Sequence, residues 1–173
     1  GLRDFHDKKK LEDLLIALNK IKKENKTEIP LLLKISPDIE NNHISEIVDT
    51  AINNNISALI LTNTTNGHRD NLVSEIKKEE GGLSGEPLQQ ISTNMIKKFY
   101  KQLNGKIPII GVGGINSGKS AYEKIMAGAS LLQLYTGLIY RGPSIAKEIK
   151  RELIQILKSE GIKNIKDAVG KSV

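Results

Sequence analysis

The chain has 173 residues, a formal net charge of +6 and no cysteine, and 38% of its residues are hydrophobic while 27% are charged. This length and composition are typical of one globular domain with a sizeable core, and they exclude a disordered or fibrous chain. The absence of cysteine excludes disulfides, thiolate metal sites and a cysteine nucleophile. No apolar run approaches the roughly 20 residues of a membrane span, and the polar first residues predict no secretory signal.

The positive charge does not predict a nucleic-acid-binding protein. Lysines are spread along the chain rather than clustered, arginines are few and only 3% of the residues are aromatic. Nucleic-acid-binding surfaces usually gather arginines and interleave aromatic side chains for base stacking. We therefore expect no nucleic-acid partner.

The first third of the chain is predicted to alternate between amphipathic helices and short buried strands. Apolar residues spaced three and four apart indicate a helix, whereas short continuous apolar runs indicate a buried strand. The expected elements are a helix over 11–21 with Leu11, Leu14, Leu15, Leu18 and Ile21 inward and Asp4 or Asp7 as its cap, a strand over 29–35, a helix over 44–52 and a strand over 57–62.

The same alternation continues after a long polar loop from Asn63 to about Pro87. The expected elements are a helix over 88–103, a strand over 107–112, a helix over 120–126, a strand over 129–135 and a helix over 144–157. Strands that are apolar on both faces and alternate with helices predict an α/β fold with a parallel sheet. Four strand–helix units fit either a doubly wound sheet or part of a (β/α)8 barrel, which needs about 250 residues when complete.

Functional residues are expected in the loops that follow the strands, since both architectures place their sites there. Lys34 is the only charged residue in the run 31–35, so it either faces an anionic ligand or lies at a strand edge with its ammonium in water. The run 62–65 (Thr-Asn-Thr-Thr) offers donors and acceptors to a polar planar ligand, although such residues also end strands in ordinary turns.

Glycine-rich turns form the remaining candidate sites. The run 81–87 (Gly-Gly-Leu-Ser-Gly-Glu-Pro) either lets the backbone approach a ligand or is a loop that ends where Pro87 begins a helix. The turns at 111–118 and 135–137 follow consecutive strands, and their free N–H groups together with a helix N-terminus predict a phosphate site. Residues 113–120 also match the letters of a nucleoside-triphosphate loop, but no strand ends in a clear magnesium-binding acid.

The three histidines, His6, His43 and His68, lack the spacing of metal ligands. We expect surface or loop positions for them, with His68 as a residue that could line an entrance.

Several motifs together carry a family resemblance. They are Gly-Leu-Arg at 1–3, Lys-Ile-Ser-Pro-Asp at 34–38, Thr-Asn-Thr-Thr at 62–65, Gly-Gly-Leu-Ser-Gly-Glu-Pro-Leu at 81–88, Ile-Ile-Gly-Val-Gly-Gly-Ile at 109–115 and Gly-Ala-Ser-Leu-Leu-Gln-Leu-Tyr-Thr-Gly at 128–137. In identity, order and spacing the chain resembles the C-terminal half of class 2, quinone-dependent dihydroorotate dehydrogenase. The resemblance implies a flavin mononucleotide (FMN)-binding (β/α)8 barrel to which residues 1–173 contribute strands five to eight, the N-terminal half being absent.

The resemblance also implies a role for each motif. Lys34 would lie at the pyrimidine edge of the flavin, and Asn63 and Thr64 would bind dihydroorotate, under a lid formed by residues 65–82. The other implied cofactor-binding residues are Thr62, Ser84 and Gly85 beside the flavin, with Gly113, Gly114, Tyr135 and Thr136 around its phosphate.

The implied activity is an oxidoreductase step of pyrimidine biosynthesis, in which dihydroorotate becomes orotate, FMN accepts the hydride and a quinone is the final oxidant. In this family the serine base precedes Gly1, so we expect no catalytic base in this chain and no activity from the chain alone. The family also implies peripheral association with the cytoplasmic side of the bacterial inner membrane through the absent N-terminal segment, or else a cytoplasmic location. Half a barrel leaves open edges, which predicts self-association.

Other readings stay open at this point. They are a class 1 enzyme that uses fumarate or NAD, another FMN- or phosphate-binding barrel, and a fragment without catalytic function.

Overall fold

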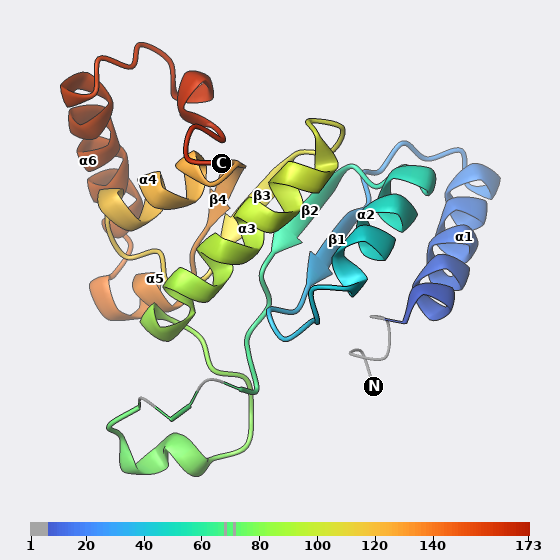
Figure 1. The fold of residues 1–173 in the computed structure, drawn as a ribbon, viewed down its shortest axis with the longest axis horizontal. Helices are drawn as coiled ribbons and strands as arrows, with labels where there is room; N and C mark the ends of the chain where they lie inside the picture. The colour runs from blue at the N-terminus through green and yellow to red at the C-terminus, as the bar shows by residue number, and fades with distance from the viewer. Residues whose placement is uncertain (1–6, 68, 71) are drawn as a thin grey trace.

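The computed structural model describes residues 7–67, 69–70 and 72–173 of the chain (Figure 1). Helices and strands alternate along it. The α-helices are α1 (Lys8–Glu24), α2 (His43–Asn53), α3 (Gln89–Leu103), α4 (Gly118–Met126), α5 (Thr136–Arg141) and α6 (Ile145–Ser159), and the strands are β1 (Leu32–Ile35), β2 (Ala58–Leu61), β3 (Ile109–Val112) and β4 (Ala129–Gln133). Short 3-10 helices are η2 (Glu75–Lys78), η3 (Glu86–Leu88) and η4 (Ile165–Ala168).

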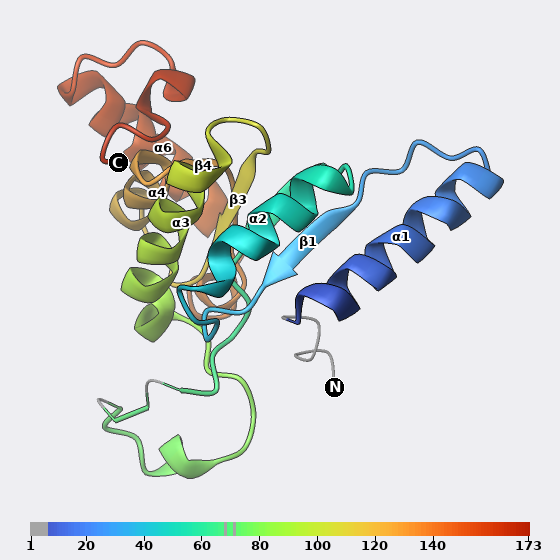
Figure 2. The same cartoon turned by 45° about the vertical axis from the view of Figure 1, so that its right-hand side comes forward.

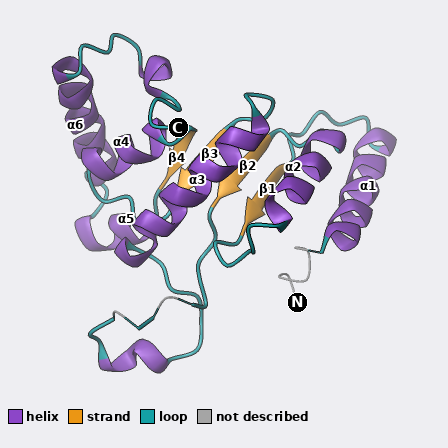
Figure 3. Cartoon of the chain, viewed as in Figure 1, coloured by secondary structure: helices purple, strands orange, loops and turns teal. Residues whose placement is uncertain are grey.

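The four strands form one parallel sheet in the order β1-β2-β3-β4 (Figure 3). Each strand therefore lies beside its successor in the chain, and the sheet is wound in a single direction. A doubly wound sheet reverses its strand order at a switch point, whereas a barrel adds its strands in sequence. The observed order thus decides between the two predicted architectures in favour of barrel-type units.

One face of the sheet is covered by helices and holds the main core. Ile35, Leu59 and Leu61 point to this face and are at most 2% exposed, and they pack with Ile96 and Phe99 of α3. Figure 2 shows α2 and α3 lying along this side of the strands. A second cluster around Ile115, Ile125 and Ile145 joins α4 to α6. The helices are amphipathic, as the sequence pattern predicts, and they lie on one side of the sheet, which that pattern left open.

The opposite face of the sheet is open in the described chain. The strand register places Leu32 beside Ala58, Lys34 beside Ile60, Ile60 beside Ile110 and Ile110 beside Leu131, so these residues share that face. Leu32 is 45% exposed and Leu131 is 63% exposed. Both β1 and β4 also lie at the ends of the described sheet. The described sheet therefore has one largely apolar face that no helix covers and two edge strands.

The boundaries follow the sequence expectations to within three residues, the first strand beginning at Leu32 instead of 29 and the last ending at Gln133 instead of 135. Asp7 caps α1 by accepting a hydrogen bond from the Lys10 N–H, as predicted, but Leu14 and Ile21 are exposed because only part of the predicted apolar face packs against α2. A short helix that the sequence did not predict, α5, follows β4 directly. Asp4, His6, His68 and the motif at 1–3 lie outside the described residues.

Candidate functional site

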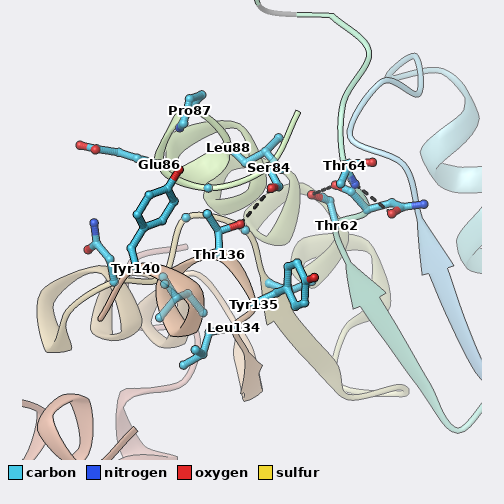
Figure 4. Close-up of a pocket in the computed structure, with 18 of the residues that line it drawn as sticks. Thr62, Thr64, Ser84, Glu86, Pro87, Leu88, Leu134, Tyr135, Thr136 and Tyr140 are labelled. Carbon is cyan, nitrogen blue, oxygen red and sulfur yellow. Dashed lines mark hydrogen bonds between the residues drawn. The ribbon is translucent and has the colours of Figure 1, made fainter. Parts of the chain in front are cut away.

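A pocket of about 590 Å³ lies at the carboxyl ends of the strands (Figure 4). Lys34 of β1 and the loops that follow β2, β3 and β4 line it, at the end of the sheet where both predicted architectures place a site. Its lining includes every residue that the sequence selected for cofactor or substrate binding, namely Lys34, Thr62, Asn63, Thr64, Ser84, Gly85, Gly113, Gly114, Tyr135 and Thr136. Motifs spread over about 100 residues of sequence are therefore neighbours in space.

Lys34 is the only lysine among the described residues that line this pocket. It belongs to β1, and its side chain is exposed on the open face of the sheet, beside Ile60 of β2. The ammonium is therefore not buried in the core, and it needs no carboxylate partner to offset a desolvation cost. It supplies a positive charge to the wall of the pocket.

The segment after β2 is held in place by its own backbone and side chains. The Asn63 N–H donates to the Ile35 carbonyl at 2.7 Å, which ties this segment to the end of β1. The Asn63 side-chain oxygen accepts from the Thr64 N–H at 2.9 Å, and the Thr62 hydroxyl donates to the Asn63 carbonyl at 3.0 Å. Asn63 also lines the pocket, and because its oxygen is bonded to the Thr64 N–H, its amide NH2 group remains as a donor.

Ser84 and Thr136 join two sides of the pocket. Their hydroxyl oxygens are 2.9 Å apart and share a hydrogen bond (Figure 4). Next to them, Gly85 has φ +85°, and a Cβ there would lie 3.0 Å from Cγ2 of Thr136. The contact between Ser84 and Thr136 therefore closes one side of the pocket, which Tyr135 also lines.

The turn after β3 fits closely against the start of α3. Gly114 has φ +71°, and a Cβ on it would lie 2.6 Å from the Cα of Gln89. Ser92, one turn into α3, donates to the Val112 carbonyl at 2.5 Å and so ties the helix to the end of β3. This geometry leaves no room for a side chain at Gly114, and the bare backbone of the turn lines the pocket.

The N-terminus of α4 is not available to an anion, which corrects one sequence-based expectation. Ser117 and Ser120 form a capping box, and the carboxylate of Glu152 on α6 accepts a hydrogen bond from the Gly118 N–H. The negative charge that would favour this helix end is already supplied by Glu152. Lys119 is not among the described lining residues, so the letters at 113–120 do not form a nucleotide-binding loop here.

Lys124 is the most deeply buried charged residue among those described, with none of its side chain exposed. Its ammonium donates to the Gln89 carbonyl and to the Thr93 hydroxyl, both at 3.2 Å. Burial lowers the pKa of Lys124 to about 8, while neighbouring Glu123 acts in the opposite direction. Glu123 also accepts from the Gln89 side chain at 2.9 Å. Together the two α4 residues fix the first residue of α3.

Further residues line the pocket that sequence reasoning did not select. Tyr140 and Arg141 come from the unpredicted helix α5, and Arg141 forms an ion pair of 2.6 Å with Glu148 of α6. The Ser144 hydroxyl, bonded to the Glu148 carboxylate, lowers the pKa of Glu148, and Arg141 adds to this effect. The only sequence signal for α5 is the change from polar to apolar residues after Tyr135. This apolar run is too short to show helical periodicity, so α5 could not be predicted from it.

Two sequence candidates lie apart from the pocket. His43 begins α2 and lines a separate hollow with Asp7 and Glu46. The expected lid, residues 65–82, contributes no described residue to the pocket, and in Figure 1 this loop projects away from the sheet. Within the loop, the Arg69 guanidinium donates to the carbonyls of Lys77, Glu79 and Gly81.

Comparisons with known proteins agree with this geometry. The chain is 41% identical over 98% of its length to a mitochondrial dihydroorotate dehydrogenase (quinone) of Arabidopsis thaliana, and 43% identical over 98% to a dihydroorotate dehydrogenase (quinone) of Trichodesmium erythraeum. It covers only 38% and 46% of these two relatives. A ligand-free DHODH crystal structure from Eimeria tenella superimposes with a TM-score of 0.90 at 37% identity, covering 99% of this chain and 52% of that one.

The fold therefore corresponds to half of a (β/α)8 barrel enzyme. Across the described residues, none of the helices combines the length and apolar character that a membrane span needs. A family model described as dihydroorotate dehydrogenase matches residues 1–157, which is most of the chain. With its motifs gathered in one pocket at the strand ends, the chain belongs to the dihydroorotate dehydrogenase family.

Proposed function

We propose that this chain forms the flavin-binding half of a dihydroorotate dehydrogenase that passes electrons to a quinone, in the synthesis of pyrimidines. The observation that carries the proposal is the shared pocket: an ammonium on β1, a Thr-Asn-Thr segment after β2 and a bare glycine turn after β3 line one cavity. An ammonium, polar ring-binding groups and backbone donors are the groups that a flavin nucleotide and an anionic ring substrate need.

The lining residues fit FMN by a structural criterion. The backbone at Gly114 and Gly85 has positive φ, and the pocket wall there carries no side chain, so backbone N–H groups can reach a phosphate. Gly113, Gly114, Tyr135 and Thr136 would hold the phosphate, and Lys34, Thr62, Ser84 and Gly85 would hold the ring. When bound, FMN supplies hydride acceptance. The Lys34 ammonium then stabilises negative charge at the edge of the pocket.

Substrate binding falls to the segment after β2. The Asn63 amide NH2 is available because its oxygen is already bonded to the Thr64 N–H. Asn63 and Thr64 would bind and orient dihydroorotate. No residue of this chain is assigned as the base that removes its proton, and we place that base in the segment that supplies the remaining strands.

The open sheet face supports the assignment of residues 1–173 as half of a barrel. Leu32 and Leu131 are exposed on it, and β1 and β4 are unpaired on their outer sides within the described sheet. Parallel strands are rarely left with an open apolar face, because each face of such a sheet is normally covered.

We use the term complete barrel for this chain together with the segment that supplies the remaining strands. Any peripheral contact with a membrane would come from that segment.

The proposed function is tested on the purified complete barrel. It should carry a flavin absorption band that orotate perturbs, and anaerobic dihydroorotate should bleach it. Reoxidation by a quinone analogue, compared with fumarate and with NAD, distinguishes the quinone-dependent class from class 1. A barrel without bound flavin, or with flavin that dihydroorotate does not reduce, would contradict the proposal. The chain alone should show no turnover.

The role of Lys34 gives a sharper test. In Lys34→Met the rate of flavin reduction by dihydroorotate should fall about 100-fold, the usual effect of removing one group that stabilises developing charge. Flavin should remain bound through the glycine turns. Lys106→Met removes an exposed lysine outside the described pocket lining and serves as the control. Stopped-flow absorbance of the flavin measures both variants, and an unchanged rate in Lys34→Met would refute the assigned role.

A further inference from the structure

Asp38 connects the loops that follow β1 and β2. It lies four residues after Lys34, and its carboxylate accepts hydrogen bonds from the Thr65 hydroxyl and, at 2.9 Å, from the Asn66 N–H. Thr65 is fully buried, and its hydroxyl also accepts from the Gly67 N–H at 3.0 Å. Bonds from N–H and O–H groups to a carboxylate are stronger than bonds between neutral groups.

Thr65 is also the point at which the long loop leaves the pocket. Its backbone pairs with Leu83 in both directions, at 3.1 Å and 2.7 Å, so the two ends of the loop are joined there. Thr64, which lines the pocket, directly precedes it, and Ser84, which also lines the pocket, directly follows Leu83. Asp38 therefore contacts the junction between pocket and loop, while Asp38 itself is not among the described lining residues.

We infer that Asp38 and Thr65 form a positioning pair that fixes the Asn63–Thr64 segment against the substrate and anchors the base of the 66–82 loop. This inference rests on the proposed function, because it assumes that Asn63 and Thr64 bind dihydroorotate. The pair acts on substrate binding and not on binding of the FMN phosphate, because the carboxylate holds the loop after β2, whereas the turns assigned to the phosphate follow β3 and β4.

The test uses the flavin-loaded complete barrel and compares Thr65→Val with Thr65→Ser. Valine has a similar shape but removes the hydroxyl, whereas serine keeps it. Thr65→Val and Asp38→Ala should raise KM for dihydroorotate about tenfold, the effect of losing a charge-assisted hydrogen bond. The maximal rate of flavin reduction and the affinity for FMN should change less than twofold. Thr65→Ser should resemble the wild type.

The KM of Asp38→Asn and the rate of tryptic cleavage of the loop test the same pair independently. Asp38→Asn retains one acceptor for Thr65 but puts an NH2 group near the Asn66 N–H, so its KM should lie between those of the wild type and Asp38→Ala. Tryptic cleavage after Lys77 and Lys78 should be faster in Thr65→Val than in Thr65→Ser, since the base of the loop is then less firmly held.

The outcomes separate the two proposals. Wild-type barrel that does not reduce its flavin with dihydroorotate overturns the proposed function, and this inference with it. Normal wild-type turnover with an unchanged KM in Thr65→Val overturns the inference alone. A parallel loss of FMN affinity in Thr65→Val and Asp38→Ala also overturns it, because the pair would then support the whole pocket.

Discussion

Gly114 occupies the tightest position in the pocket wall. Its φ of +71° is unfavourable for residues with a side chain, and a Cβ there would meet the backbone of Gln89 at 2.6 Å. Gly105 has nearly the same φ, +76°, but nothing lies within 4 Å of a Cβ built on it. Alanine at Gly105 would therefore meet only the energetic cost of a left-handed backbone, whereas alanine at Gly114 would meet that cost and a steric clash with Gln89.

Replacing each of these glycines by alanine should have unequal effects. Gly105→Ala should lower the free energy of unfolding by about 1 kcal/mol, the usual cost of a left-handed backbone for alanine. Gly114→Ala should cost at least about 2 kcal/mol, because the start of α3 must move as well. It should also weaken FMN binding tenfold or more. Urea unfolding and flavin titration of the complete barrel measure both effects, and equal losses in the two variants would contradict the explanation.

At the scale of secondary-structure elements, α3 and α4 are joined by a buried polar contact. Lys124 and Glu123 of α4 both bond to Gln89, the first residue of α3, and Gly114 packs against the same residue. Among the described residues, the Lys124 ammonium bonds to a carbonyl and a hydroxyl and to no carboxylate, and its burial is costly while it is charged. The start of α3 is thus positioned at an energetic cost.

This cost predicts a specific dependence of stability on pH. The folded-state pKa of Lys124 is about 8, below its ordinary value of 10.5. Between these two pH values the unfolded chain holds more protons than the folded chain, so the free energy of unfolding should rise with pH. The contribution of Lys124 is about 3 kcal/mol across this window, since one pKa unit corresponds to about 1.4 kcal/mol. Below pH 8 the stabilisation is absent, because both states are protonated.

The measurement compares the wild-type complete barrel with Lys124→Met by urea unfolding from pH 7 to pH 10.5. Methionine has no charge, so the stability of the wild type relative to the variant should increase as the pH rises through this range. Lys119→Met, at an exposed position of the same helix, should follow the wild type. A difference that does not depend on pH would mean that folding does not lower the pKa of Lys124.

At the scale of the whole molecule, the described chain is one-sided. Helices cover one face of the sheet, while the other face exposes Leu32 and Leu131 between two unpaired edges. Exposed apolar faces and open strand edges favour association. We therefore expect the isolated chain to associate with itself, and the segment that supplies the remaining strands to compete for the same surface.

Leu131→Lys should reduce this self-association, because a charge on the open face is costly to bury. Ile154→Lys changes a residue of α6 that is 53% exposed away from this face and is the matched control. Size-exclusion chromatography with light scattering at micromolar concentrations should show oligomers for the wild type and Ile154→Lys, and mainly monomer for Leu131→Lys. A monomeric wild-type chain would show that the open face does not drive association.

The order of strands and helices, and the placing of the motifs, could be derived from the sequence. Continuous apolar runs and period-3.6 apolar patterns are local, so short runs such as 29–35 and 57–62 were sufficient to find the strands. The carboxyl ends of parallel strands share one edge of the sheet, and Lys34, Asn63 and Gly114 therefore meet in one pocket. The chemistry assigned to that pocket came from the family resemblance and not from periodicity.

Features that depend on partners distant in the chain required the folded structure. Glu152 occupies the N-terminus of α4, Ser84 engages the Thr136 hydroxyl, and Asp38 holds Thr65, across 34, 52 and 27 residues of sequence respectively. The choice between a doubly wound sheet and barrel units depended on strand order, which the hydrophobic pattern does not encode. Such contacts arise because the chain satisfies its buried polar groups with whichever groups packing brings near, and sequence spacing carries no record of that proximity.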